Sequence, residues 1–107
     1  MSLSPARYDE EAWEGRDWSR PYQLPEGFAE DYTGASVVAT IKFSFNDTEP
    51  VAEIVAPVDV DGAFSLSIAA AEMMDANRYV WDAYFTTGGE KNPLWNGLFR
   101  VNESVGE

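Results

Sequence analysis

Residues 79–85 read YVWDAYF, and the large apolar side chains of this stretch fall at every second position. The stretches GAFSLSI at residues 62–68 and WNGLFRV at residues 95–101 show the same alternation. Because successive side chains of a strand point to opposite faces, a period of two places the apolar set on one face of a sheet. The three stretches therefore predict three β-strands, each with one face in a core.

Residues 37–45, VVATIKFSF, form the clearest strand pattern in the first half of the chain. The alternation predicts an inward apolar set, comprising Val37, Ala39, Ile41, Phe43 and Phe45. Turn-forming sequences follow at residues 46–50, 59–62 and 88–92, and the last of these carries two glycines suited to a hairpin. Six to eight short strands with turns about every ten residues predict an all-β, immunoglobulin-like sandwich of antiparallel strands.

The one good helix-forming sequence is AAAEMMDA at residues 69–76. We predict a short crossover helix of about two turns there, between two strands.

A chain of 107 residues has the size of one domain. Within it we expect an N-terminal arm and edge strand at residues 1–24, a sandwich core at residues 25–102 and a loose tail at residues 103–107. Pro21 lies inside the strand pattern of the arm, and proline cannot donate to a sheet ladder, so this strand is predicted at a sheet edge. An edge strand near a terminus is suited to exchange between copies, so the arm is a candidate packing element.

The chain contains neither cysteine nor histidine. These absences exclude a disulfide, a Ser-His-Asp triad, a Cys-His pair and an ordinary zinc site within one chain. Asp59 and Asp61 resemble the start of a calcium loop, but Ala70 stands where such a loop needs a glutamate, so we predict a turn. Adjacent acids elsewhere lie in loop or edge sequence and are interpreted as a solvated charged surface. We expect no enzyme, no cofactor and no metal.

Nineteen acidic residues against seven basic ones give the chain a net charge of −12. An anionic surface repels nucleic acid phosphates and anionic lipids, so we expect neither nucleic acid nor a membrane as a partner. Solubility and attraction of a basic protein partner both account for the charge. No apolar run approaches the roughly 20 residues of a membrane-spanning helix. The first eight residues show no secretion signal, so we expect the product to stay where it is made unless it travels inside an assembly.

Aromatic and apolar residues outside the predicted core are the candidates for a protein interface. Trp81 and Trp95 share the parity of core residues, whereas Trp13 has no alternation around it and either faces a partner or packs on its own domain. Leu94 and Leu98 fall opposite Trp95 and are predicted to form an outward apolar patch. The full candidate set is Tyr8, Trp13, Trp18, Phe28, Tyr32, Tyr84, Leu94 and Leu98.

Six segments stand out along the chain: PARYD at residues 5–9, EGRDW at 14–18, DYTGA at 31–35, GAFSLS at 62–67, RYVWD at 78–82 and GLFRV at 97–101. In this order they resemble small proteins encoded in tailed bacteriophages and prophages. Those proteins are similar to the immunoglobulin-like N-terminal domain of phage baseplate upper proteins. The acidic and aromatic loop at residues 24–31 departs from this pattern.

The resemblance implies a virion structural protein, either a head decoration or cement protein or a component of the tail or baseplate. Its partners would be capsid, portal or tail proteins, in a homo-oligomer or another multi-copy assembly. It would be made in the host cytoplasm and located in the virion. A second function stays open, namely a module that binds carbohydrate or a host protein through aromatic loops such as the one carrying Phe28 and Tyr32.

Overall fold

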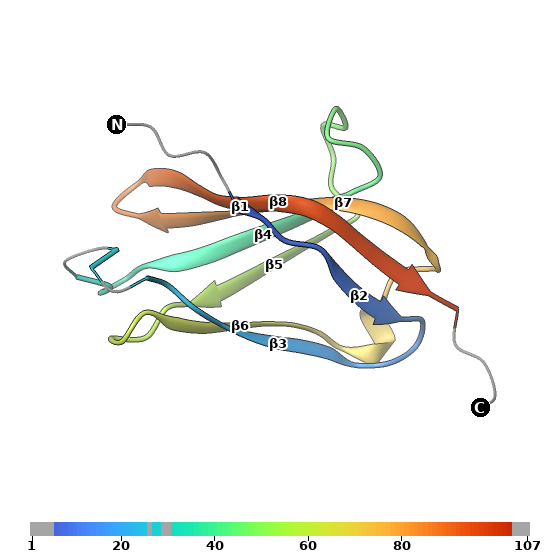
Figure 1. The fold of residues 1–107 in the computed structure, drawn as a ribbon, viewed down its shortest axis with the longest axis horizontal. Helices are drawn as coiled ribbons and strands as arrows, with labels where there is room; N and C mark the ends of the chain where they lie inside the picture. Colours follow the sequence, from blue (N-terminus) through green and yellow to red (C-terminus); the bar gives the residue numbers. More distant parts are fainter. Residues whose placement is uncertain (1–5, 26, 29–30, 104–107) are drawn as a thin grey trace.

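The computed structural model describes residues 6–25, 27–28 and 31–103, and it is built almost wholly of strands (Figure 1). The elements in chain order are β1 (Ala6–Arg7), β2 (Glu10–Trp13), β3 (Trp18–Gln23), β4 (Ser36–Lys42), β5 (Ala52–Pro57), β6 (Ala63–Ile68), the 3₁₀ turn η1 (Ala70–Glu72), β7 (Asn77–Thr87) and β8 (Glu90–Asn102). A large sheet has the order β1-β8-β7-β4-β5, with β2 also paired to β8. A small sheet contains β3 and β6.

The two sheets enclose one core, and the predicted immunoglobulin-like β-sandwich is confirmed. Four strand pairs are antiparallel, as predicted: β3–β6, β4–β5, β4–β7 and β7–β8. The pairs β1–β8 and β2–β8 are parallel, and the antiparallel strands of the prediction do not include them. The N-terminal segment lies beside the C-terminal strand and runs in its direction, instead of pairing with its neighbour in sequence.

The core consists of the inward rows that alternation predicted. On β4, β6, β7 and β8 the buried residues are Val37, Ala39, Ile41, Phe64, Leu66, Ile68, Tyr79, Trp81, Ala83, Phe85, Trp95, Phe99 and Val101. The predicted hairpin is also present, because Gly88 and Gly89 alone connect β7 to β8 and both have positive φ. This combination of φ values is the one that two-residue hairpins favour.

Phe43 and Phe45 correct the prediction for the first-half strand. Their side chains are 55% and 51% exposed, although the alternation placed them inward. The ladder of β4 ends at Lys42, and the Asp47 N–H donates to the Ser44 carbonyl in a turn. Both residues therefore follow the end of β4, where the chain leaves the sheet in a loop (Figure 1). The Phe43 ring still contacts Tyr79, with 5.2 Å between the centroids.

The predicted helix at residues 69–76 is also wrong in type and length. The structure has only η1, Ala70–Glu72, with extended backbone on both sides of it. Two acidic side chains hold this connection, since Asp17 accepts the Ala70 N–H at 2.7 Å and Glu14 accepts the Ala76 N–H at 2.6 Å. Because these contacts and the span between the two sheets fix the backbone, tertiary structure overrides a helix propensity that is weak in so short a segment.

The tyrosine corner of immunoglobulin-like domains is present at the start of β7. The Tyr79 hydroxyl donates to the Asp75 carbonyl at 2.7 Å. In antibody domains the residue two places after this tyrosine is the cysteine of the inter-sheet disulfide, and here it is Trp81. The Trp81 ring meets Trp18 of the small sheet, with 6.1 Å between the centroids, so an aromatic contact joins the sheets at this point.

Residues 6–24 of the segment expected as an N-terminal arm lie within the sandwich, and residues 1–5 of that segment lie outside the described residues. Ala12 and Trp18 are 1% and 4% exposed, and β1, β2 and β3 all pair with strands of their own chain. The predicted edge position of β3 is confirmed, because β3 pairs only with β6 among the described strands. Apart from Glu103, the predicted tail lies outside the described residues.

Gly97 allows the N-terminal segment to approach β8 closely. The Tyr8 N–H donates to the Asn96 carbonyl at 3.0 Å, and the Tyr8 carbonyl accepts from the Trp81 indole N–H at 2.9 Å. A Cβ on Gly97 would collide with that same Tyr8 carbonyl. A glycine inside a strand often marks such an approach of a second backbone.

Removing the Trp18 ring tests the contact between the sheets. We expect Trp18→Ala to lower the free energy of unfolding by about 3–5 kcal/mol, because it empties a buried aromatic site. Trp13→Ala is the matched control, and at 44% exposure it should cost no more than about 0.5 kcal/mol. Urea titrations followed by circular dichroism measure both values, and equal losses would contradict this account of the core.

Adding one methyl group at Gly97 tests the close approach of the N-terminal segment. We expect Gly97→Ala to destabilise the domain by about 1–3 kcal/mol, because the new Cβ displaces the Tyr8 backbone. The Tyr8 amide should then exchange faster with solvent, since its bond to Asn96 is lost. Asn96→Ala, at the next and outward position, is the control. A Gly97→Ala protein with unchanged Tyr8 protection would overturn the assignment.

Candidate interaction surfaces

The outer face of the large sheet carries three rows of side chains across β4, β7 and β8, which are half-buried except for the exposed Pro93 and Asn96. One row contains Val38, Tyr84 and Pro93, the next Thr40, Asp82 and Asn96, and the third Lys42, Val80 and Leu98. Trp13 lies at the edge of the same face, opposite Asn102 of β8. The predicted candidates Trp13, Tyr84 and Leu98 therefore share one surface, which we call the large-sheet face.

Charge is distributed unevenly between the large-sheet face and the remainder of the chain. Five of the seven basic residues lie on this face, namely Arg7, Lys42, Arg78, Lys91 and Arg100. The acids there are Glu11, Glu53, Asp82 and Asp9, the last paired with Arg7 at 3.3 Å. Five cations against four acids leave +1, so the other residues of a chain with net charge −12 together carry −13.

Asp82 stands in the middle row of the large-sheet face. Its Oδ1 atom is buried and has no hydrogen-bond partner among the described residues. Burial raises the pKa of the Asp82 carboxyl, and the positive charge of Lys42 opposes that shift. A cation from a partner would satisfy this acceptor, because charged hydrogen bonds are strongest where water is excluded.

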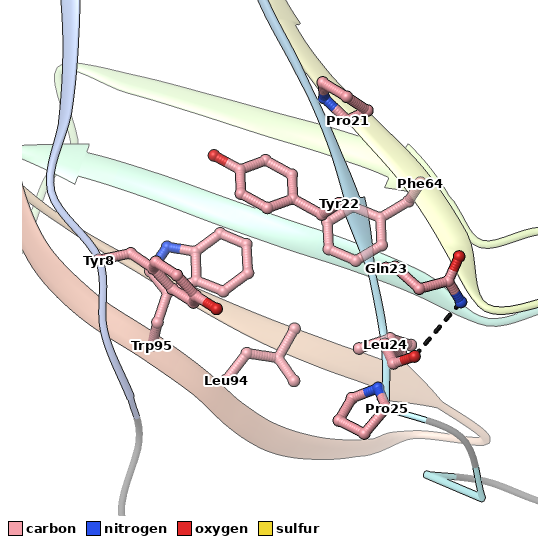
Figure 2. A pocket seen from close by; sticks show the side chains of 9 residues that line it. All are labelled: Tyr8, Pro21, Tyr22, Gln23, Leu24, Pro25, Phe64, Leu94 and Trp95. Atoms are coloured by element: carbon pink, nitrogen blue, oxygen red, sulfur yellow. Dashed lines mark hydrogen bonds between the residues drawn. The ribbon is translucent and has the colours of Figure 1, made fainter.

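A second surface is an aromatic groove of about 330 Å³ at the seam between the sheets (Figure 2). Its lining residues are Tyr8, Pro21, Tyr22, Gln23, Leu24, Pro25, Phe64, Leu94 and Trp95. The Tyr22 ring stacks on Phe64 and on Trp95, with centroids 5.4 Å and 4.9 Å away. The faces of these rings are therefore largely used within the domain, and Tyr8, 49% exposed, is the ring most available to a ligand.

Polar groups border the aromatic groove. The Tyr22 hydroxyl donates to Glu10 Oε2 at 3.0 Å, while Glu10 Oε1 accepts from the Arg20 guanidinium at 3.2 Å. Burial raises the pKa of Tyr22, and the Glu10 charge adds to the shift. This phenol thus stays protonated at any physiological pH and serves as a hydrogen-bond donor.

Leu94 corrects the prediction of an outward leucine pair. Ala83 pairs with Trp95 and Tyr84 pairs with Pro93, so Leu94 is the extra residue of a β-bulge. A bulge shifts the alternation by one residue. Leu94 consequently packs against the core and lines the aromatic groove, whereas Leu98 stays on the large-sheet face.

The remaining candidates for a protein interface are Trp18, Phe28 and Tyr32. Trp18 is 4% exposed and is a core residue, so it is not accessible to a partner. Phe28 and Tyr32 pack against Phe85, with centroid distances of 5.1 Å and 6.1 Å. Sequence reasoning missed Phe43 and Phe45 as exposed rings, and the turn-forming residues that follow Phe45 are the one signal that the strand ends nearby.

The acidic groups examined as metal ligands have other roles. Asp59 is a turn residue, as predicted, because its Oδ1 atom accepts the N–H groups of Asp61 and Ala63, both at 2.9 Å. Within the described residues no three acidic side chains are placed to hold a metal ion. In the same part of the chain, no helix has the length and apolar character needed to cross a bilayer.

Comparison with known proteins identifies the fold and no closer relationship. No known family model matches the chain, and no curated protein matches it. Among solved structures, that of the NK cell receptor Nkp44, titled a triggering partner in natural cytotoxicity, is similar with a TM-score of 0.50. The similarity covers 95% of this chain and 100% of that one at 13% sequence identity, and it shows the immunoglobulin-like fold alone.

Because burial raises the pKa of Asp82, we predict that replacing this residue increases the stability of the domain by an amount that depends on pH. The folded state binds this proton more tightly than the unfolded state, so ionised Asp82 opposes folding above its folded pKa. We expect Asp82→Asn to raise the melting temperature near neutral pH. The gain should shrink as the pH falls through the folded pKa toward the ordinary value of 3.8. Thermal melts over a pH series measure this, with Glu53→Gln as the control for loss of one surface charge. An increase in melting temperature that does not depend on pH would contradict this prediction.

Proposed function

We propose that this chain is a non-enzymatic structural protein of a tailed-bacteriophage virion, which binds neighbouring virion proteins through the large-sheet face. The observation that carries the proposal is the composition of that face. It combines half-buried Val80, Tyr84 and Leu98 with nearly equal numbers of basic and acidic residues, in a chain whose net charge is −12. The apolar residues lie on both sides of the polar middle row that contains Asp82, and exposed apolar residues among polar ones are typical of protein interfaces.

The virion role follows from the sequence resemblance to small phage and prophage proteins. A rigid sandwich suits a building block, because binding through a preformed sheet face requires little ordering of the backbone. The chain would be made in the host cytoplasm and would contact capsid, portal or tail proteins in several copies. The role is tested by purifying phage particles from the bacterium that encodes the chain. We expect mass spectrometry to find it in them at a fixed ratio to the capsid or tail proteins, and its absence would overturn the role.

A substitution on the large-sheet face tests the proposed contact. We expect Leu98→Glu to weaken incorporation into particles by about tenfold or more, because it places a charge within the apolar part of an interface. Val60→Glu is the matched control, since Val60 is 88% exposed on the turn between β5 and β6. Circular dichroism establishes that both variants fold. Equal incorporation of the two variants would exclude this face as the site of contact.

The aromatic groove favours a second candidate function, a module that binds carbohydrate or a host protein. Tyr8 presents an exposed ring there, with the Gln23 amide and Glu10 nearby as hydrogen-bonding groups. A glycan array distinguishes the two functions. The second candidate would be favoured by a glycan that binds the wild-type chain with a micromolar dissociation constant and no longer binds the Tyr8→Ala variant.

A further inference from the structure

In the small sheet, the edge of β6 that faces away from β3 has no hydrogen-bonded neighbour among the described strands, although β5 lies close to β6. The Leu24 N–H donates to the Gly62 carbonyl at 3.0 Å, and these residues continue the β3–β6 register. Hydrogen-bonded pairs alternate in an antiparallel ladder, so Tyr22–Phe64, Arg20–Leu66 and Trp18–Ile68 are bonded pairs. Ser65 and Ser67 then direct their N–H and carbonyl groups away from β3.

These groups of Ser65 and Ser67 have no partner among the described residues. The backbone hydrogen bonds between this edge of β6 and the preceding segment are confined to the turn, where the Asp59 N–H donates to the Ala63 carbonyl at 3.0 Å. No ladder connects β5 to β6 in the described part of the chain. The open edge therefore begins after Ala63 and extends to the end of the strand.

Two other free edges, those of β3 and β5, carry features that prevent pairing with another chain. On β3, Pro21 lacks an outward N–H, and the Ser19 carbonyl accepts from the Arg20 guanidinium at 3.1 Å. On β5, Glu53 places a charge and Pro57 again lacks a donor. Natural proteins use proline and charge in this way to block association between edges. The sequence of β6, AFSLSI, contains neither proline nor charge.

Electrostatics indicates which partner suits this edge. Two copies of a chain with net charge −12 repel each other over most of their surfaces. The outward side chains beside the open edge are Ser65, Ser67 and, across the ladder, Ser19 and Pro21, all of them uncharged. Two copies can approach along this strip without placing acidic groups directly against each other.

We propose that two copies of this chain associate through β6, pairing antiparallel across a two-fold axis at Leu66. Ser65 of one copy then lies opposite Ser67 of the other, and each pair exchanges both backbone hydrogen bonds. Leu66 falls in the intervening non-bonded pair. The two small sheets become one continuous sheet of four strands, β3-β6-β6-β3. The contact is isologous, as a two-fold dimer requires. It uses a different surface from the large-sheet face and does not rest on the virion role.

Sedimentation equilibrium of the purified chain over a concentration series tests the proposal. We expect a monomer–dimer equilibrium that shifts toward the dimer when salt is added, because salt screens the repulsion between the two acidic copies. Ser65→Pro should raise the dissociation constant by about tenfold or more, since it removes one bonding N–H per copy and leaves the β3 ladder intact. A monomer at every concentration and salt level would overturn the proposal.

Ser19→Pro is the matched control for this substitution. Ser19 lies in the same sheet, faces the same side and directs its N–H to the opposite, already blocked edge. It should leave the dissociation constant unchanged, and an equal effect of both prolines would overturn the proposal. Leu98→Glu should likewise leave the dimer intact, so failure of the large-sheet contact and failure of this dimer are distinguishable.

Amide hydrogen exchange gives a second measurement that needs no substitution. In the wild-type protein the amides of Ser65 and Ser67 should become protected as concentration rises, while the Ser19 amide should stay unprotected. This pattern supports the dimer even if a proline variant fails to fold. A dimer in which Ser65 and Ser67 still exchange rapidly would place the contact elsewhere and overturn the proposal.

Discussion

The contact of Trp18 with Trp81 and Phe99 is the interaction on which the sandwich depends. The three rings come from β3, β7 and β8, and each pair of centroids lies between 5.1 Å and 6.1 Å apart. A two-stranded sheet has marginal stability by itself, so the small sheet persists because its inner face is buried against these rings. Antibody domains place a disulfide between the sheets at this position. This chain has no cysteine and uses aromatic burial instead.

The close approach of Tyr8 to β8 completes the large sheet at one edge. Gly97 leaves the space for it, and the Trp81 indole donates to the Tyr8 carbonyl. The same tryptophan therefore links the two sheets with its ring and holds the N-terminal segment with its N–H. This arrangement explains why the described residues of the expected N-terminal arm are part of the sandwich. It also joins the N-terminal strands to the last strand of the domain, since β2 lies beside the final residues of β8.

The sequence predicted the fold where the signal is local. Alternation identified β6, β7 and β8, and the paired glycines at residues 88–89 identified the hairpin, because both signals depend only on neighbouring residues. The parallel pairing of β1 and β2 with β8 depends on contacts between distant residues and left no local pattern. Phe43 and Phe45 continued the alternation past the end of the ladder, so their exposure could not be predicted from the period alone.

The candidate surfaces were predicted less well than the fold, for the same reason. Leu98 and Tyr84 lie outward as parity indicates, but the bulge at Leu94 reverses its direction. Pro93 beside it is the one local signal, because proline inside a sheet is confined to edges, strand starts and bulges. The uneven distribution of charge was also hidden, because the basic residues that gather on the large-sheet face are scattered through the sequence from Arg7 to Arg100. Only the topology places them together.

Charge and edge protection together determine where this domain can meet another protein. Acidic groups dominate the loops at the ends of the strands, and proline blocks the edges of β3 and β5. On the large-sheet face the acids are balanced by basic residues, and the β6 edge carries neither charge nor proline. These two surfaces lie on different sheets. Contacts at separate surfaces can form at the same time, so one domain can bind a different protein on one side and its own copy on another. Binding through two separate surfaces requires no catalytic group and is compatible with a sandwich that stays rigid.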